Sequence, residues 1–282
     1  MHQNLLIGAL ILSQLTLGIY SYVIKTIPAN LSTQVLARAS IFTALAVLAG
    51  YASGQPVMPS LSHLLTMGPL NVINIASSYY AYTHLPTMVS IPLLYIYPFI
   101  NIFLSSALLN STVHLWSIPW LVLSFIGVLT IILHKGKLSH NIWAIGAILV
   151  AAITESLIYI SFKSGYHQSQ FNGLFHLYAG SLIAVIAAAG TNLIAPFDFT
   201  ASLWMPLTFF IACIGFVGIV VETYAIPLLS VELFSALAFF AVISAYIFTH
   251  LASESTPTLK TILGSVLIIT GAVAVRYISE KQ

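Results

Sequence analysis

The stretch YYAYTHLPTMVSIPLLYIYP, residues 79–98, is strongly apolar, yet it contains three prolines spaced six residues apart and five tyrosines. A proline inside a helix removes one backbone hydrogen bond and bends the helix, which membranes tolerate where neighbouring groups satisfy the freed carbonyl. Pro86 begins a helix, where proline costs little, whereas Pro92 and Pro98 fall inside the expected span. We therefore expect a bent membrane helix near 87–108.

The composition of the whole chain supports this interpretation. Hydrophobic residues make up 59% of the 282 residues, charged residues only 5%, and the mean hydropathy is +1.02. A soluble domain carries about 25% charged residues, so this chain lacks the charge to cover a surface in water. We predict an all-α integral membrane protein. At roughly 20 apolar residues per span, its length allows about ten helices.

Apolar runs bounded by charged residues, proline, glycine and asparagine predict the individual spans. They lie near 3–25, 32–50, 61–83, 87–108, 115–134, 141–163, 172–190, 203–226, 230–250 and 258–278. The single cysteine, Cys213, leaves no disulfide framework and no CxxC metal site, and we expect no cofactor or metal. The small net charge of +2 does not indicate a nucleic-acid partner. The expected partners are the lipid bilayer and a small-molecule substrate.

The two sets of five spans resemble each other. At an offset of 144 residues, Tyr80-Ala81 matches Tyr224-Ala225 and Gly127 matches Gly271. At an offset of 138 near the start of each half, Gly8 matches Gly146 and Lys25 matches Lys163. Because five spans is an odd number, two such halves are inserted in opposite orientations. We predict ten transmembrane helices as two inverted five-helix repeats, residues 1–138 and 139–282. Inverted repeats are typical of secondary transporters, whose substrate site lies between the halves.

These residues carry a family resemblance over essentially the whole chain. The segments YYAYTHLPTMVS and ETYAIPLLSVELFS close one span and turn into the next, and SFIGVLTII and IITGAVAV form glycine-containing last helices. In these features the chain resembles the drug/metabolite transporter superfamily, EamA type. The resemblance implies a ten-helix transporter with both termini in the cytoplasm. It names no substrate.

Polar side chains on the third and fourth spans share helix faces. Asn71, Asn74 and Ser78 follow i, i+3, i+7 spacing, and Tyr97 and Asn101 lie one turn apart. Such stripes are unfavourable against lipid, so they line either a cavity or a helix contact. We predict that Asn71, Asn74, Tyr97 and Asn101 bind substrate in a shared water-filled space. The alternative is that these asparagines join helices by hydrogen bonds.

Glu155 falls well inside the sixth span, with Tyr159 one turn further on. A carboxylate at the centre of a membrane helix costs about 2.5–3.5 kcal/mol on insertion scales, so a retained one usually faces a cavity. We predict that Glu155 couples transport to protons or binds a cationic substrate, with Tyr159 beside it. The alternatives are a structural pair with Arg38 or Lys163, or a neutral, protonated side chain.

Two further acids flank the turn between the eighth and ninth spans, Glu222 and Glu232. Both are expected near the same membrane face, where an interfacial carboxylate and a functional one are equally good interpretations. Glu222 continues the small and polar stripe of Gly215 and Gly218, so it joins the predicted substrate-binding residues. Arg38, early in the second span, is expected either to extend outward to the interface or to meet an acid.

The sequence thus predicts a secondary transporter in the cell (inner) membrane, a monomer or homodimer, that works by alternating access. Phosphorylated substrates need arginine or lysine clamps, and the expected cavity has at most Arg38. A cationic, zwitterionic or neutral solute, such as an amine or amino acid, fits better. The alternative is an intramembrane enzyme or channel that uses Glu155. HExxH, GxSxG and paired-aspartate motifs are absent from the sequence, whose single aspartate is Asp198.

Overall fold

The computed structural model describes residues 3–132, 141–165, 167, 169–252 and 259–280. Within these residues the protein is all-α and has no strand. The predicted boundary between the halves, at 138/139, lies outside the described residues.

The helices follow the predicted spans within a few residues. The first part of the chain forms α1 (Gln3–Thr26), α2 (Leu31–Ala52), α3 (Leu61–His84), α4 (Thr87–Leu94), α5 (Tyr97–Leu109), a 3₁₀ turn (Leu115–Ser117) and α6 (Ile118–Ile132). The second part forms α7 (Ile142–Lys163), α8 (Gln170–Gly190), α9 (Ala201–Phe210), a π-helical turn (Ile211–Phe216), α10 (Val217–Ala225), α11 (Val231–Ala238), α12 (Phe240–Ala252) and α13 (Leu259–Glu280).

Eight segments of the described chain are long and apolar enough to cross a membrane. They include the continuous stretches that combine α4 with α5, α9 with α10, and α11 with α12. The helix α3 is 24 residues long but carries the polar stripe, and 15 residues of α6 are described. The protein is therefore an all-α, multi-pass membrane protein.

Local sequence explains where several helices begin. Asn30 and Asn141 precede α2 and α7, and each side-chain oxygen accepts a hydrogen bond from the backbone N–H three residues on. Ser169 and Ser230 do the same for α8 and α11. Such caps satisfy backbone donors that have no partner within the helix.

The fourth and ninth spans are both interrupted. The helix α4 ends before Tyr95 and α5 starts at Tyr97, with Pro98 in its first turn, which is where the three prolines predict a bend. The ninth span is interrupted at Phe239, between α11 and α12. These two breaks are 144 residues apart.

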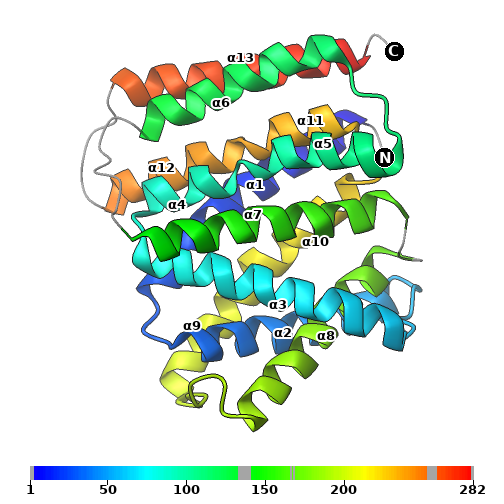
Figure 1. The fold of residues 1–282 in the computed structure, drawn as a ribbon, viewed down its shortest axis with the longest axis vertical. Helices are drawn as coiled ribbons and strands as arrows, with labels where there is room; N and C mark the ends of the chain where they lie inside the picture. The colour runs from blue at the N-terminus through cyan, green and yellow to red at the C-terminus, as the bar shows by residue number, and fades with distance from the viewer. Residues whose placement is uncertain (1–2, 133–140, 166, 168, 253–258, 281–282) are drawn as a thin grey trace.

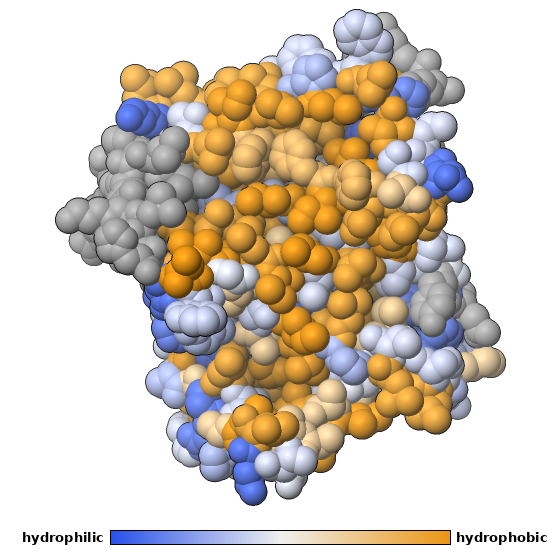
Figure 2. All heavy atoms as spheres, in the orientation of Figure 1, coloured by the Kyte–Doolittle hydropathy of each residue, from blue (hydrophilic) through white to orange (hydrophobic). Residues whose placement is uncertain are grey.

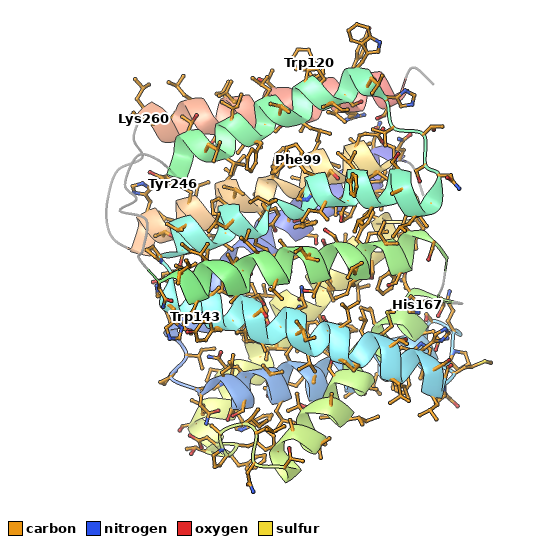
Figure 3. All side chains as sticks on the ribbon, in the orientation of Figure 1. Phe99, Trp120, Trp143, His167, Tyr246 and Lys260 are labelled. Atoms are coloured by element: carbon orange, nitrogen blue, oxygen red, sulfur yellow. The ribbon has the colours of Figure 1, made fainter. Side chains whose placement is uncertain are left out.

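The helices lie side by side in layers (Figure 1). The pair α6 and α13 forms one edge of the molecule, and α4–α5 lies beside α11–α12. The helix α7 crosses the middle and packs on α3, while α2, α3 and α8 pack together toward the opposite edge. Trp143 near the start of α7 and His167 beyond its end lie at opposite sides of the layer (Figure 3).

Apolar side chains cover the middle of the visible face, as a lipid-facing surface requires (Figure 2). Many of the large exposed side chains are apolar, among them Leu12, Leu48, Phe103, Ile153 and Val273. Outside a bilayer, an apolar surface of this extent would drive aggregation.

Glycines allow three close helix contacts inside the bundle. A Cβ atom on Gly180 of α8 would lie 2.7 Å from the Gly68 Cα of α3. A Cβ on Gly127 of α6 would lie 2.5 Å from the Gly264 carbonyl oxygen, and one on Gly271 of α13 would lie 2.5 Å from the carbonyl oxygen of Trp120. Small residues let membrane helices approach to backbone contact, which is how α3 joins α8 and α6 joins α13.

Candidate functional site

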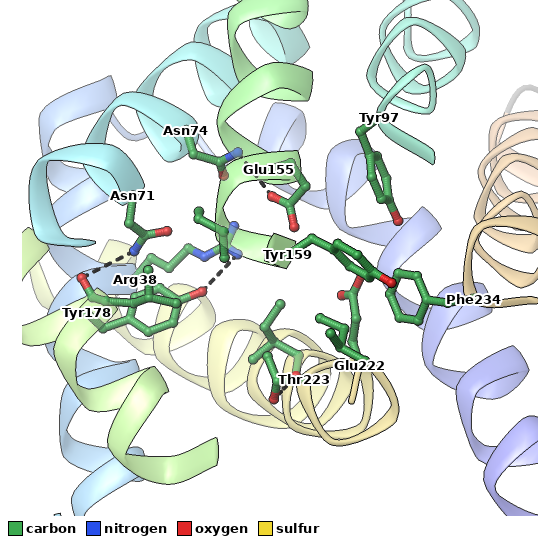
Figure 4. A pocket seen from close by; sticks show the side chains of 14 residues that line it. Arg38, Asn71, Asn74, Tyr97, Glu155, Tyr159, Tyr178, Glu222, Thr223 and Phe234 are labelled. Carbon is green, nitrogen blue, oxygen red and sulfur yellow. Dashed lines mark hydrogen bonds between the residues drawn. The ribbon is translucent and has the colours of Figure 1, made fainter. Parts of the chain in front are cut away.

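Two adjoining cavities lie in the middle of the bundle, and Figure 4 shows the side chains that line one of them. Their volumes are about 20 Å³ and about 80 Å³. One water needs roughly 10–15 Å³, so together they hold several waters or a small solute, and they are smaller than a typical drug-sized pocket. Six residues line both cavities: Arg38, Asn74, Tyr97, Glu155, Ile219 and Glu222. We call this combined space the central cavity.

Glu155 is held by a side chain from the other half of the sequence. The amide nitrogen of Asn74, on α3, donates to Glu155 Oε2 at 3.0 Å (Figure 4). The same nitrogen is 3.0 Å from the Ala151 carbonyl oxygen and 3.2 Å from Thr154 Oγ1. Asn74 therefore joins α3 to α7 and also directs the carboxylate into the cavity. Asn74 both lines the cavity and joins two helices, so both of its predicted alternatives apply.

Glu222 also faces the central cavity and is only 6% exposed. Of the two interpretations of Glu222, the buried position in the cavity wall does not fit a hydrated interfacial carboxylate and is compatible with a functional one. Distance from a helix end measures depth along the helix but not the direction of a side chain. The α10 face that carries Gly218 and Glu222 packs on α1, where a Cβ on Gly218 would lie 2.9 Å from Leu17. That packing turns Glu222 inward.

Glu232 has a structural role outside the central cavity. Its Oε1 accepts a hydrogen bond of 2.7 Å from the backbone N–H of His114, and the side chain is 2% exposed. It lines neither part of the central cavity. Glu232 therefore stabilises the connection before α6.

Arg38 does not extend outward: it lies in the wall of the central cavity, which Glu155 and Glu222 also line, and its direct partners are tyrosines. Its Nη1 donates to the Tyr79 hydroxyl at 3.4 Å and its Nη2 to the Tyr178 hydroxyl at 3.2 Å. The guanidinium carbon lies 5.1–5.8 Å from the ring centroids of Tyr20, Phe42, Tyr79 and Tyr178. Aromatic faces attract a cation at these distances. Among the described residues, no carboxylate forms an ion pair with Arg38 within 4.0 Å.

Three other predicted residues line the central cavity. Asn71 lies in its wall while donating to Ser181 Oγ at 2.9 Å. Tyr97 belongs to both parts of the cavity, and the Tyr159 hydroxyl is buried there without a hydrogen-bond partner. These polar groups converge from α3, α5 and α7.

Asn101 is the predicted site residue that the structure places elsewhere. It is fully buried, lines neither part of the central cavity, and its amide has no hydrogen-bond partner. The prediction that it faces the cavity is wrong, because α5 carries it one turn beyond Tyr97 into the contact with α7 and α11. Helical spacing places Asn101 one turn along α5 from Tyr97, but it does not show how far along α5 the cavity extends.

Helical spacing does not indicate the tyrosines that surround Arg38. Tyr20, Tyr79 and Tyr178 are at most 5% exposed, and the hydroxyls of Tyr20 and Tyr79 are 2.6 Å apart. The available signal was a tyrosine in the middle of an apolar helix, as Tyr178 is in α8. Most membrane tyrosines lie at interfaces, which is why this signal is easily set aside.

A third cavity, of about 250 Å³, lies at the end of α7 and shares Thr223 with the central cavity. Phe162 and His167 also line it. The ring centroid of His63 lies 5.9 Å from that of His167, and the ring centroid of His176 lies 6.0 Å from it. Burial, assisted by these two neighbouring imidazoles, lowers the pKa of His167 to about 4. In the described part of the chain, no cluster of three or more potential metal-ligating side chains is arranged for a metal ion.

Comparison with known proteins finds a solved structure of similar fold but indicates no activity. No family model matches the chain, and no curated protein matches it. A solved structure described only as "Crystal structure of protein" is similar at a TM-score of 0.74, covering 98% of this chain and 97% of that one. The sequence identity is 14%, so the similarity concerns the fold alone.

Proposed function

We propose that this protein is a secondary transporter that moves a small organic solute by alternating access. The observation that carries the proposal is the central cavity, where two carboxylates and an arginine face one small space inside an apolar helix bundle. Charged side chains are costly within a membrane and usually mark an ion or substrate pathway. The walls come from α1 to α5 in the first part of the chain and from α7, α8, α10, α11 and the π-helical turn in the second.

We further propose ten spans in two inverted repeats, as in the EamA-type transporters that the sequence resembles. Corresponding contacts support this arrangement. Lys25 Nζ donates to the Leu85 carbonyl oxygen at 3.1 Å, and Lys163 Nζ donates to the Leu229 carbonyl oxygen at 2.5 Å. The lysines are 138 residues apart and the leucines 144, which are the two repeat offsets.

Other features repeat at the larger offset. The interruptions at Tyr95 and Phe239 correspond, and Ser124 Oγ donates to the carbonyl oxygen of Ile268, which is 144 residues further on. The contact of Gly127 with Gly264 corresponds to that of Gly271 with Trp120. A pair of elements with the same contacts in both halves is what a pseudo-two-fold axis requires.

The charges in the cavity favour a substrate with an ammonium group, an amine or an amino acid. Glu155 and Glu222 offer two carboxylates, and the tyrosine rings offer faces that attract cations. Arg38 is the only arginine or lysine among the described residues that line the cavity, too few for a phosphorylated substrate. Transport is coupled to protons through Glu155, and the third cavity, which shares Thr223 with the central one, supplies access from one side of the membrane.

Ligand-dependent thermal stability of the purified protein tests this proposal. A ligand at 100 times its dissociation constant stabilises the folded state by about 2.7 kcal/mol. We expect stabilisation by members of a panel of amines and neutral amino acids, and none by dicarboxylates or sugar phosphates. The effect should weaken in Glu155→Gln and persist in the matched control Glu232→Gln, whose site lies outside the cavity. Stabilisation by sugar phosphates alone would contradict the proposal.

A further inference from the structure

The charges around the central cavity do not balance. Glu155 and Glu222 supply two carboxylates, and Arg38 supplies one positive charge. Arginine stays protonated under all ordinary conditions, so its charge is fixed. The other titratable groups that line the cavity are tyrosines, which are neutral at neutral pH: Tyr20, Tyr82, Tyr95, Tyr97, Tyr159 and Tyr178. With both acids ionised, the described lining therefore carries one net negative charge.

Asn74 donates one hydrogen bond to Glu155, but among the described residues no second cation lines the cavity to compensate for that charge. Apolar residues such as Ile219, Ile158 and Phe234 complete the walls, and the cavity holds only a few waters. A buried charge without a partner is strongly unfavourable, and a titratable group in that position takes up a proton instead. Two carboxylates that face one space disfavour each other's ionisation, so the first proton to bind removes most of the imbalance.

We propose that Glu155 and Glu222 together hold one proton in the empty cavity, because the fixed charge of Arg38 balances one carboxylate and leaves the other to be neutralised. The consequence rests on the proposed transport function. A substrate with one ammonium group replaces that proton, so one proton moves for each singly charged substrate and the exchange is electrically neutral. Arg38 thereby sets the coupling ratio without binding the proton itself.

The proton count can be measured without knowing the substrate. The probe is the C=O stretch of protonated carboxyl groups in the infrared spectrum of the protein in lipid at neutral pH, with the Glu155→Gln/Glu222→Gln double variant as baseline. One shared proton predicts one carboxyl signal in the wild type and its complete loss in either Glu155→Gln or Glu222→Gln, because the remaining carboxylate then balances Arg38. Asp198→Asn, in an exposed loop, should leave the signal unchanged.

Any other number of protons on Glu155 and Glu222 would contradict the inference. If each carboxylate holds its own proton, either single variant keeps half of the signal. If both are ionised, the wild type matches the double variant. Arg38→Gln should double the signal and Arg38→Lys should preserve it. If Arg38→Gln fails to fold, the two single variants and the double variant of Glu155 and Glu222 still determine the number of bound protons.

The proposed function and this inference can fail separately. If no amine or amino acid binds but the carboxyl signal behaves as described, the substrate proposal fails and the single shared proton stands. If a substrate is transported but the single variants keep half of the signal, the coupling ratio is wrong and the transport proposal stands.

Discussion

Gly68 of α3 and Gly180 of α8 lie backbone against backbone, with room for no further atom between them. This contact brings together the helix that carries Asn71 and Asn74 and the helix that carries Tyr178, so it determines the width of the cavity at Arg38. We expect Gly180→Ala to destabilise the protein by about 1–3 kcal/mol, the usual cost of overpacking. Thermal unfolding in detergent measures this effect.

The chain contains a control for that substitution. A Cβ on Gly146 of α7 would meet no other atom within 4 Å. Because alanine favours a helix over glycine by about 1 kcal/mol, Gly146→Ala should be neutral or stabilising. Equal losses of stability in both variants would show that helix packing at Gly180 is not the cause.

The tyrosines around Arg38 should matter for stability as well as for shape. Tyr79→Phe keeps the ring but removes the hydroxyl that accepts from Arg38 and lies 2.6 Å from that of Tyr20. We expect a loss of about 1–3 kcal/mol, because buried polar groups are left without partners. Tyr224→Phe, at a side chain that is 40% exposed, serves as the control and should change the unfolding temperature little.

The corresponding contacts of Lys25 and Lys163 predict the topology of the two halves. Each lysine ends the first helix of its half, so in an inverted repeat the two ends lie on opposite sides of the membrane. In a Cys213→Ser background, Lys25→Cys and Lys163→Cys should react with an impermeant thiol reagent from opposite sides. Reaction from the same side would rule out inverted halves.

Stability should also depend on pH through His167, in the loop between α7 and α8. Its folded-state pKa of about 4 is below the ordinary value of about 6.5, so between these values the unfolded chain binds the proton more readily. The stability that the neutral imidazole contributes is therefore complete above about pH 6.5 and is lost as the pH falls toward 4. The unfolding temperature of the wild type should fall across this window, and that of His167→Gln should fall less. Parallel curves would exclude His167 as the cause.

Much of the fold is predictable because it depends mainly on one large free energy, that of transferring apolar side chains from water into lipid. That term marks the spans, and the prolines of 79–98 mark the bend before Tyr97. The direction of single side chains depends on rotation and packing between helices, which a helical period does not contain. This is why the spacing places Asn71, Asn74, Tyr97, Glu155 and Tyr159 in the wall of one cavity, as the structure does, but misplaces Asn101 and leaves the direction of Glu222 open. Their binding of substrate stays a prediction.

Arg38 illustrates the same limit. Burial of an arginine leads one to expect an acidic partner, yet its hydrogen bonds go to tyrosines from α3 and α8. Those helices are distant from Arg38 in sequence, and they pack together through the close contact of Gly68 with Gly180 and the hydrogen bond from Asn71 to Ser181. Only the packed structure brings these groups together.

The central claim is that the cavity carries a solute across the membrane and that Glu155 couples this movement to protons. The most direct test is uptake of radiolabelled amines and amino acids into proteoliposomes under an imposed pH gradient. We expect the wild type to accumulate a substrate against its gradient. Glu155→Gln should lose accumulation but keep exchange of labelled for unlabelled substrate, while Glu232→Gln behaves as the wild type. Flux no greater than in protein-free liposomes for every compound, or proton-driven accumulation in Glu155→Gln equal to that of the wild type, would contradict the account.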